Sequence, residues 1–196
     1  MGDILRRRGM MVIPSSSPTP EWDYEWLPSM GKPEDNGMTL RTEGTYSNNL
    51  YNTYIALTQG GSSNYIIYNY PNTYQTGVAE YRVSIQGSNA KFYLYFGNGT
   101  YGIGARFQYS SSYKGIYLGP GTTTKLITAE LETVYKVKLV LKGTTGDVYV
   151  DDVLLAEDVD VTSMAAYDLR CAFQATGSSS RTGRVYSIRY KFNRTA

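Results

Sequence analysis

Three carboxylates near the start of the chain have the type and spacing for chemistry on a sugar. Glu21, Asp23 and Glu25 alternate with Trp22 and Tyr24, and alternate side chains of a β-strand point to the same side of a sheet. Retaining hydrolysis of a glycosidic bond needs two carboxyl groups beside that bond, one as nucleophile and one as proton donor. Glycoside hydrolysis is therefore one hypothesis. The alternative is an edge strand whose aromatic residues pack on one side while its carboxylates meet solvent.

A second set of residues suits sugar binding without catalysis. Glycan sites combine flat aromatic rings with planar polar groups that can form two hydrogen bonds at once. Such side chains alternate with apolar residues along segments that we predict to be neighbouring strands, on the side that we expect to face outward. They are Arg82, Tyr93, Tyr95, Arg106 and Gln108. We predict a glycan-binding face there; an ordinary exposed sheet face rich in Tyr and Arg is the open alternative.

The segment 65–74 is predicted to be a loop that could form the rim of a second ligand-binding site. It carries four aromatic rings with hydroxyl groups, Tyr65, Tyr68, Tyr70 and Tyr74.

Other reactive residue types are scarce. The absence of histidine removes the usual Ser-His and Cys-His nucleophile pairs and most catalytic zinc sites. The single cysteine, Cys171, alternates with Leu169 and Phe173, so we expect a buried thiol that packs as a small apolar group. We predict no catalytic residue and no bound metal or cofactor.

One stretch of the chain is rich in the oxygen ligands that calcium takes. Several carboxylates gather in one stretch: Asp147, Asp151, Asp152, Glu157, Asp158 and Asp160. Calcium needs about six or more oxygens that converge from several loops, which this spacing neither shows nor excludes. We therefore interpret these residues as solvated turn charges.

Length and charge narrow the class of protein. The 196 residues suffice for one domain with a sizeable core and not for two ordinary domains. The 19 Lys and Arg against 17 Asp and Glu leave a charge of +2, too small for the field of a nucleic-acid or anionic-membrane binder. No run approaches the roughly 20 apolar residues of a membrane span. We expect no nucleic acid, no membrane insertion and no signal peptide.

The pattern of the chain indicates an arm and one β domain. The tract Pro14–Pro20 is rich in Pro and Ser, so we predict a flexible N-terminal arm over 1–20 and a packed domain over 21–196. From Met38 onward, short runs of period two are separated by Gly, Asn and Ser clusters. About a dozen strands without crossover helices predict an all-β jelly roll, a sandwich of two antiparallel sheets without any helix.

Two passages carry a family resemblance. Thr133–Glu157 contains Val148–Leu155, which resembles the strand, turn and strand of concanavalin A-like (laminin G-like) sandwiches, and Phe173–Tyr190 resembles their final strand. Asp152 stands where the family's turn has Gly, and Asp can adopt the same left-handed conformation at modest cost. The resemblance implies a concanavalin A-like fold.

The resemblance also assigns roles to the first three carboxylates. Glucanases of this fold carry such a triplet, which implies Glu21 as nucleophile, Glu25 as acid/base and Asp23 as helper if the chain is an enzyme. Their triplet lies on a central strand in the middle of the chain, whereas this one follows a proline tract near the start. The position argues against hydrolysis.

The N-terminal segments suggest a biological setting. Ile4–Met11, Trp22–Tyr24 and Gly31–Gly37 look like laminin G-like proteins of phages and prophages. The resemblance implies a tail-associated protein, located in the virion or in the host cytoplasm before assembly. We expect a non-catalytic binding or attachment module for cell-surface carbohydrate. The alternatives are a structural virion protein that oligomerises through its sandwich, and a hydrolase using Glu21, Asp23 and Glu25.

Overall fold

The structure is a computed structural model that describes residues 22–59, 65–70, 76–87, 90–97, 102–119, 124–162, 171–177 and 181–192. The arm predicted over 1–20 and Glu21 lie outside the described residues. For the strand 171–177 only the backbone is described, so the expectation of a buried Cys171 thiol stays a prediction.

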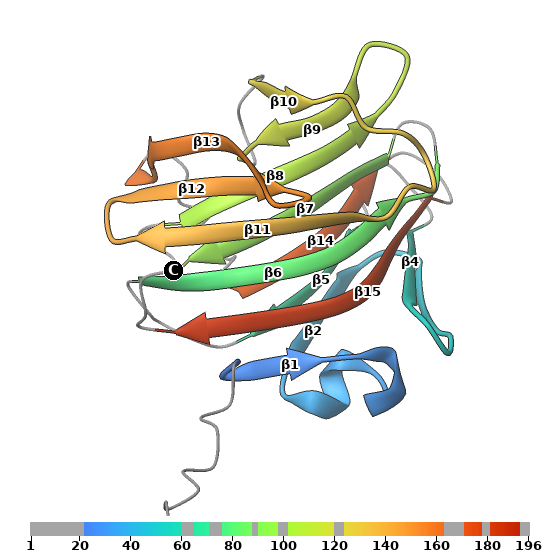
Figure 1. The fold of residues 1–196 in the computed structure, drawn as a ribbon. Coiled ribbons are helices and arrows are strands. Elements are labelled where there is room, and N and C mark those ends of the chain that lie inside the picture. Colours follow the sequence, from blue (N-terminus) through green and yellow to red (C-terminus); the bar gives the residue numbers. More distant parts are fainter. Residues whose placement is uncertain are drawn as a thin grey trace, which may run out of the picture.

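The described strands form two antiparallel sheets packed face to face (Figure 1), which confirms the predicted all-β sandwich. Sheet A has the order β13-β12-β11-β6-β15-β4-β3, with β1 paired to β15. Sheet B has the order β10-β9-β8-β7-β14-β5-β2. The bounds in sheet A are β1 Tyr24–Trp26, β3 Tyr46–Leu50, β4 Ile55–Gln59, β6 Thr76–Ile85, β11 Tyr135–Lys142, β12 Thr145–Val150, β13 Val153–Asp160 and β15 Arg181–Phe192. Those in sheet B are β2 Thr39–Glu43, β5 Tyr65–Tyr70, β7 Ala90–Gly97, β8 Gly102–Tyr109, β9 Lys114–Leu118, β10 Lys125–Ile127 and β14 Cys171–Gly177.

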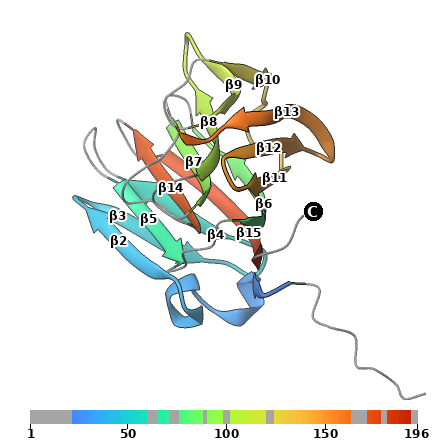
Figure 2. The same cartoon turned by 90° about the vertical axis from the view of Figure 1, so that its left-hand side faces the viewer.

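Two short 3₁₀ turns are described from end to end, where no helix was expected. They are η1 (Pro28–Met30) and η2 (Pro33–Asn36), each with a proline at its first position, where the fixed φ of proline suits a helical start. Together with β1 they lie at one end of the sandwich, while β10 and β13 approach each other at the opposite end (Figure 2). Among the described residues, no helix is long and apolar enough to cross a bilayer.

The core follows from strict alternation along the strands. Phe92, Leu94 and Phe96 of β7 point into the space between the sheets and are buried. Val137 and Leu139 of β11 face them from sheet A and are buried too. Because β-strand side chains alternate between faces, the intervening residues of both strands must lie on the outer sides of the two sheets.

A two-residue turn joins β12 to β13 at the position of the family resemblance. Asp151 has φ 50° and Asp152 has φ 66°, the left-handed pair that a tight antiparallel hairpin favours. The backbone N–H of Lys136 donates a hydrogen bond to Oδ1 of Asp151 at 2.9 Å. The expectation that Asp152 adopts the conformation of the family's Gly is confirmed.

Candidate ligand-binding face

Four of the five predicted binding residues lie together on the outer side of sheet B. Tyr93 and Tyr95 belong to β7, and Arg106 and Gln108 belong to the adjacent strand β8. Tyr93 is the direct cross-strand partner of Arg106. The neighbouring residues of β7 and β8 that point the other way, among them Phe107, belong to the core.

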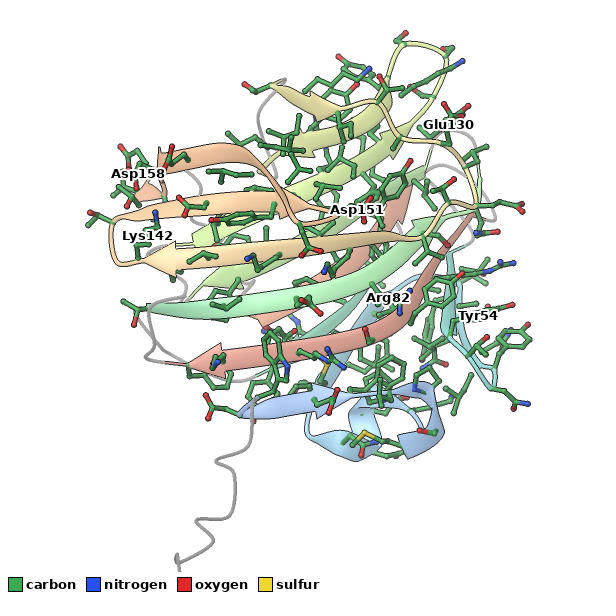
Figure 3. The ribbon with its side chains drawn as sticks, viewed as in Figure 1. Tyr54, Arg82, Glu130, Lys142, Asp151 and Asp158 are labelled. Carbon is green, nitrogen blue, oxygen red and sulfur yellow. The ribbon has the colours of Figure 1, made fainter. Side chains whose placement is uncertain are left out.

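Arg82 lies elsewhere, and its prediction as a neighbour of the other four is wrong. It is a residue of β6, which pairs with β11 and β15 in sheet A, where Lys136 and Ser187 are its partners. Figure 3 shows Arg82 on this strand. The reason is topological: alternation gives the face of a strand, but the chain between β6 and β7 passes from one sheet to the other.

Arg106 is the centre of the face. Its guanidinium carbon lies 5.2 Å from the centroid of the Tyr117 ring, and Tyr117 is its cross-strand partner on β9. Burial raises the pKa of the Tyr93 hydroxyl, while the charge and a hydrogen bond of Arg106 act in the opposite direction. Arg106 is 7% exposed, so its cation is held in a partly dry setting between two tyrosines.

Two glycines leave room for side chains to pack directly on the backbone of this face. Gly102 is on the same side of β8 as Arg106, and a Cβ atom there would overlap with the ring and hydroxyl of Tyr95. A Cβ at Gly115 of β9 would come within 2.8 Å of Cε of Lys125. Because glycine has no side chain, the Tyr95 ring and the Lys125 chain can lie directly against the strands. Tyr95 is 1% exposed although it lies on the outer side of sheet B, so other groups of the protein also cover its ring.

Two further tyrosines belong to the face and were missed in the sequence. Tyr113 and Tyr117 meet edge to face, with ring centroids 5.8 Å apart, and Tyr113 is 38% exposed. Tyr113, Gly115 and Tyr117 alternate in the sequence, so the two tyrosines were predictable as residues of one face. Their place beside Arg106 follows only from the pairing of β8 with β9. We call this surface the tyrosine-arginine face; it consists of Tyr93, Tyr95, Arg106, Gln108, Tyr113 and Tyr117.

Two residues of the predicted catalytic triplet, Asp23 and Glu25, lie beside the other sheet, and Glu21 lies outside the described residues. Oδ2 of Asp23 accepts a hydrogen bond from the backbone N–H of Phe192 at 2.7 Å. Oε1 of Glu25 forms an ion pair with Nε of Arg189 at 2.7 Å. Within the described residues β1 pairs with β15 alone, which confirms the edge position. The expectation that the carboxylates only meet solvent is wrong, because Asp23 and Glu25 contact Phe192 and Arg189.

The cluster of carboxylates considered for calcium is engaged with lysines and backbone. Nζ of Lys142 contacts Asp147 at 2.7 Å and Asp158 at 3.1 Å, and both hydrogen bonds raise the pKa of Lys142. Figure 3 shows Lys142 and Asp158 at the same end of the molecule. Hydrogen bonds from Thr162 lower the pKa of Asp160. In the part of the chain that the structure describes, no three candidate ligands lie together as a metal site.

The prediction that the tyrosines at 65–74 form a second ligand-binding loop is wrong for Tyr68 and Tyr70. Both residues belong to strand β5, not to a loop. Its pairing with β2 and β14 turns Tyr68 inward, where its hydroxyl accepts a hydrogen bond from Nδ2 of Asn48 at 2.7 Å. Tyr70 packs on Tyr24, with ring centroids 4.5 Å apart. The side chains of Tyr65 and Tyr74 lie outside the described residues.

A pocket that the sequence did not indicate lies beside η1. It has a volume of about 510 Å³ and is lined by Pro28, Ser29, Gly31, Leu50, Tyr51 and Asn52. Its lining carries no charged side chain, so it offers small polar groups and one exposed ring. It lies by the turn between β3 and β4, away from β7, β8 and β9 (Figure 1).

Comparison with known proteins places the fold but no function. No protein-family model and no curated protein sequence matches the chain. A galectin-like protein of unknown function from Bacillus subtilis is similar over 88% of this chain and 97% of its own, with TM-score 0.60 and 11% identity. The exoplasmic/lumenal domain of VIP36, in its Ca²⁺/Man3GlcNAc-bound form, gives TM-score 0.51 and 13% identity over 83% and 86% of the chains.

A sialidase is also similar, with TM-score 0.60 and 9% identity. The match covers 82% of this chain but spans only 17% of the sialidase. Identities this low establish the fold alone: a galectin-like sandwich, consistent with the predicted concanavalin A-like domain.

Proposed function

We propose that this protein is a non-catalytic glycan-binding module whose ligand contacts the tyrosine-arginine face. The carrying observation is that Tyr93, Arg106 and Tyr117 are consecutive cross-strand partners. A guanidinium thus lies between two aromatic rings on the outer side of one sheet. Rings cover the apolar face of a sugar, while Arg and Gln side chains donate hydrogen bonds to its oxygens.

The distribution of carboxylates supports a non-catalytic role. The seven strands of sheet B contain one acidic residue, Glu43 on the edge strand β2. Hydrolysis by the common mechanism needs two carboxyl groups beside the scissile bond, which these strands do not supply. Asp23 and Glu25 lie beside the other sheet. Asp23 accepts a hydrogen bond from the backbone of Phe192, and Glu25 forms an ion pair with Arg189.

The comparisons support the class of ligand in a general way. A sandwich similar to this one was solved with bound Man3GlcNAc, and another is part of a sialidase. The attachment role on a phage tail, and with it a location in the virion or the host cytoplasm, extends this proposal. It rests on the resemblance of the N-terminal segments stated above.

A glycan array of the purified protein tests the proposal. We expect binding to a defined set of glycans, weakened by about fivefold to thirtyfold in Tyr113→Ser and in Gln108→Ala, because each change removes one contact of about 1–2 kcal/mol. Tyr149→Ser is the matched control, since Tyr149 lies beside Lys138 on the outer side of sheet A. A blank array for folded protein, or equal loss in the control, would contradict the proposal.

Assembly through the sandwich is a second candidate function, favoured by one observation. Val153 is 58% exposed and Leu154 is 38% exposed on β13, which ends the strand order of sheet A. Exposed apolar edge strands promote pairing with another chain. Sedimentation of the wild type and of Leu154→Asp tests this: an oligomer that the variant dissociates supports assembly, and a monomer at every concentration refutes it.

A further inference from the structure

We infer that the pocket beside η1 binds one neutral sugar ring, as a second and weaker site that is separate from the tyrosine-arginine face. The pocket has a volume of about 510 Å³, within the range of roughly 300–1,000 Å³ that small-molecule sites occupy. Its walls come from two segments that are distant in the chain, 28–31 and 50–52. None of the six lining residues belongs to the tyrosine-arginine face, so the inference does not depend on the proposed function.

Hydrogen bonds hold both walls of the pocket in place. In the first wall, Nε1 of the buried Trp26 donates a hydrogen bond to the carbonyl oxygen of Gly31 at 2.9 Å. The backbone N–H of Gly31 donates to the carbonyl oxygen of Pro28 at 3.3 Å. In the second wall, the backbone N–H of Tyr51 donates to the carbonyl oxygen of Tyr54 at 2.8 Å. Because a preformed site loses less conformational entropy on binding, this pocket suits a small ligand that makes few contacts.

The pocket has one aromatic residue in its lining. Tyr51 is 48% exposed, and its ring packs on that of Tyr54, with centroids 4.8 Å apart. Tyr54 in turn contacts the ring of Tyr186 at 5.5 Å and the guanidinium of Arg184 at 4.6 Å. Figure 3 shows Tyr54 at this turn between β3 and β4. The Tyr51 ring is thus supported by its neighbours while nearly half of the residue stays exposed, and an exposed ring can stack on the apolar face of a sugar.

The other lining residues select a neutral ligand with hydroxyl groups. None of the six is charged, so the pocket offers no counter-charge to a desolvated ion. The hydroxyl of Ser29 and the amide of Asn52 belong to exposed residues and can both donate and accept hydrogen bonds. Pro28 and Leu50 add apolar surface. A pyranose ring combines an apolar face with a rim of hydroxyl groups, so it matches this lining better than an ion or a hydrocarbon chain does.

A titration of the full chain, followed by amide chemical shifts in NMR, tests the inference. The probes are the methyl glycosides of glucose, galactose, mannose and N-acetylglucosamine. Sorbitol at the same concentration is the matched control, since it carries hydroxyl groups without a ring. We expect at least one glycoside to shift the amides of Gly31, Tyr51 and Asn52 at millimolar concentrations, because a single sugar ring makes few contacts. Sorbitol should leave these amides unchanged.

The exposed lining residues allow variants that keep the fold. Tyr51→Ser removes the ring and Asn52→Ala removes the amide, and each should weaken binding by about fivefold or more, because each removes one contact. Tyr51→Phe retains the ring and should bind as tightly as the wild type. Tyr46→Ser is the matched control, since Tyr46 is 41% exposed and does not line the pocket. The thermal midpoint of each variant verifies folding.

The outcomes separate this site from the tyrosine-arginine face. Tyr113→Ser should leave the affinity of the pocket unchanged. The inference is overturned if no glycoside shifts the amides of the lining, if sorbitol shifts them equally, or if Tyr51→Ser binds like the wild type; none of these results touches the proposed function. Adenosine that shifts the same amides at lower concentration would show a site for flat bases and would also overturn the inference. A blank glycan array together with glycoside binding at the pocket overturns the proposed function and supports this inference.

Discussion

The outer faces of the two sheets have the same strand geometry and opposite chemistry. On sheet A, cations and acids alternate and contact each other, as Arg189 does with Glu25 and Glu80. On sheet B, tyrosines surround Arg106, and Tyr95 packs against Gly102. The strands β7 to β10 contain no acidic residue. On sheet A, ion pairs between residues of the protein therefore balance part of the charge. The outer face of sheet B combines planar rings with the positive charge of Arg106.

The comparison also separates two sources of stability. Ion pairs between exposed side chains contribute between 0 and about 1 kcal/mol. A large ring that is fully buried contributes several times more. The outer side of sheet B should therefore be the stronger determinant of folding, although it is also the candidate binding face.

The largest effect is expected for Tyr95→Ala, because it removes a ring that is 1% exposed on the outer side of sheet B. We expect a loss of about 3 kcal/mol in the free energy of unfolding. Tyr149→Ala, on the outer side of sheet A, should cost less than about 1 kcal/mol. Urea unfolding of both variants measures the difference, and similar losses would remove the distinction between the faces.

The next effect is expected for Gly102→Ala. Its added Cβ would overlap with Tyr95, and overpacking of this kind costs about 1–3 kcal/mol. In a Tyr95→Ala background the same change should cost much less, because the overlapping ring is gone. A double-mutant cycle measures this coupling; additive losses would show that Gly102 does not accommodate the ring.

A smaller effect concerns pH. Burial raises the folded-state pKa of Tyr93 above its unfolded value of about 10, so the folded state holds this proton more tightly. The resulting stabilisation is complete below that value and is lost as pH rises through the folded-state pKa. Stability should therefore fall more steeply above about pH 10 in the wild type than in Tyr93→Phe. Parallel curves from urea unfolding at several pH values would contradict this.

The smallest effect is expected on sheet A. Glu25→Gln breaks the contact with Arg189, in which both side chains are more than one third exposed, so we expect a loss below about 1 kcal/mol. The loss should shrink further in high salt. A change of several kcal/mol that ignores salt would mean that the edge strand β1 depends on this pair.

The sequence was sufficient for the fold and for part of the site, and the limit is physical. Alternation identified which residues of β7 and β8 face outward, because side-chain direction is a local property of a strand. It could not place Arg82, since the sheet to which a strand belongs depends on distant pairing. For the same reason Tyr113 and Tyr117 were missed: their nearness to Arg106 follows from the register of β9 against β8. The pocket beside η1 needs the meeting of two distant segments.

The central claim is that ligands bind on the outer side of sheet B, and the most direct test is a titration followed by amide chemical shifts in NMR. The probe is a glycan that the array shows to bind. We predict that the shifts concentrate at Tyr93, Arg106 and Tyr117, with little change along β6, β11 and β15. Shifts centred on sheet A, or on the pocket beside η1, would contradict the account.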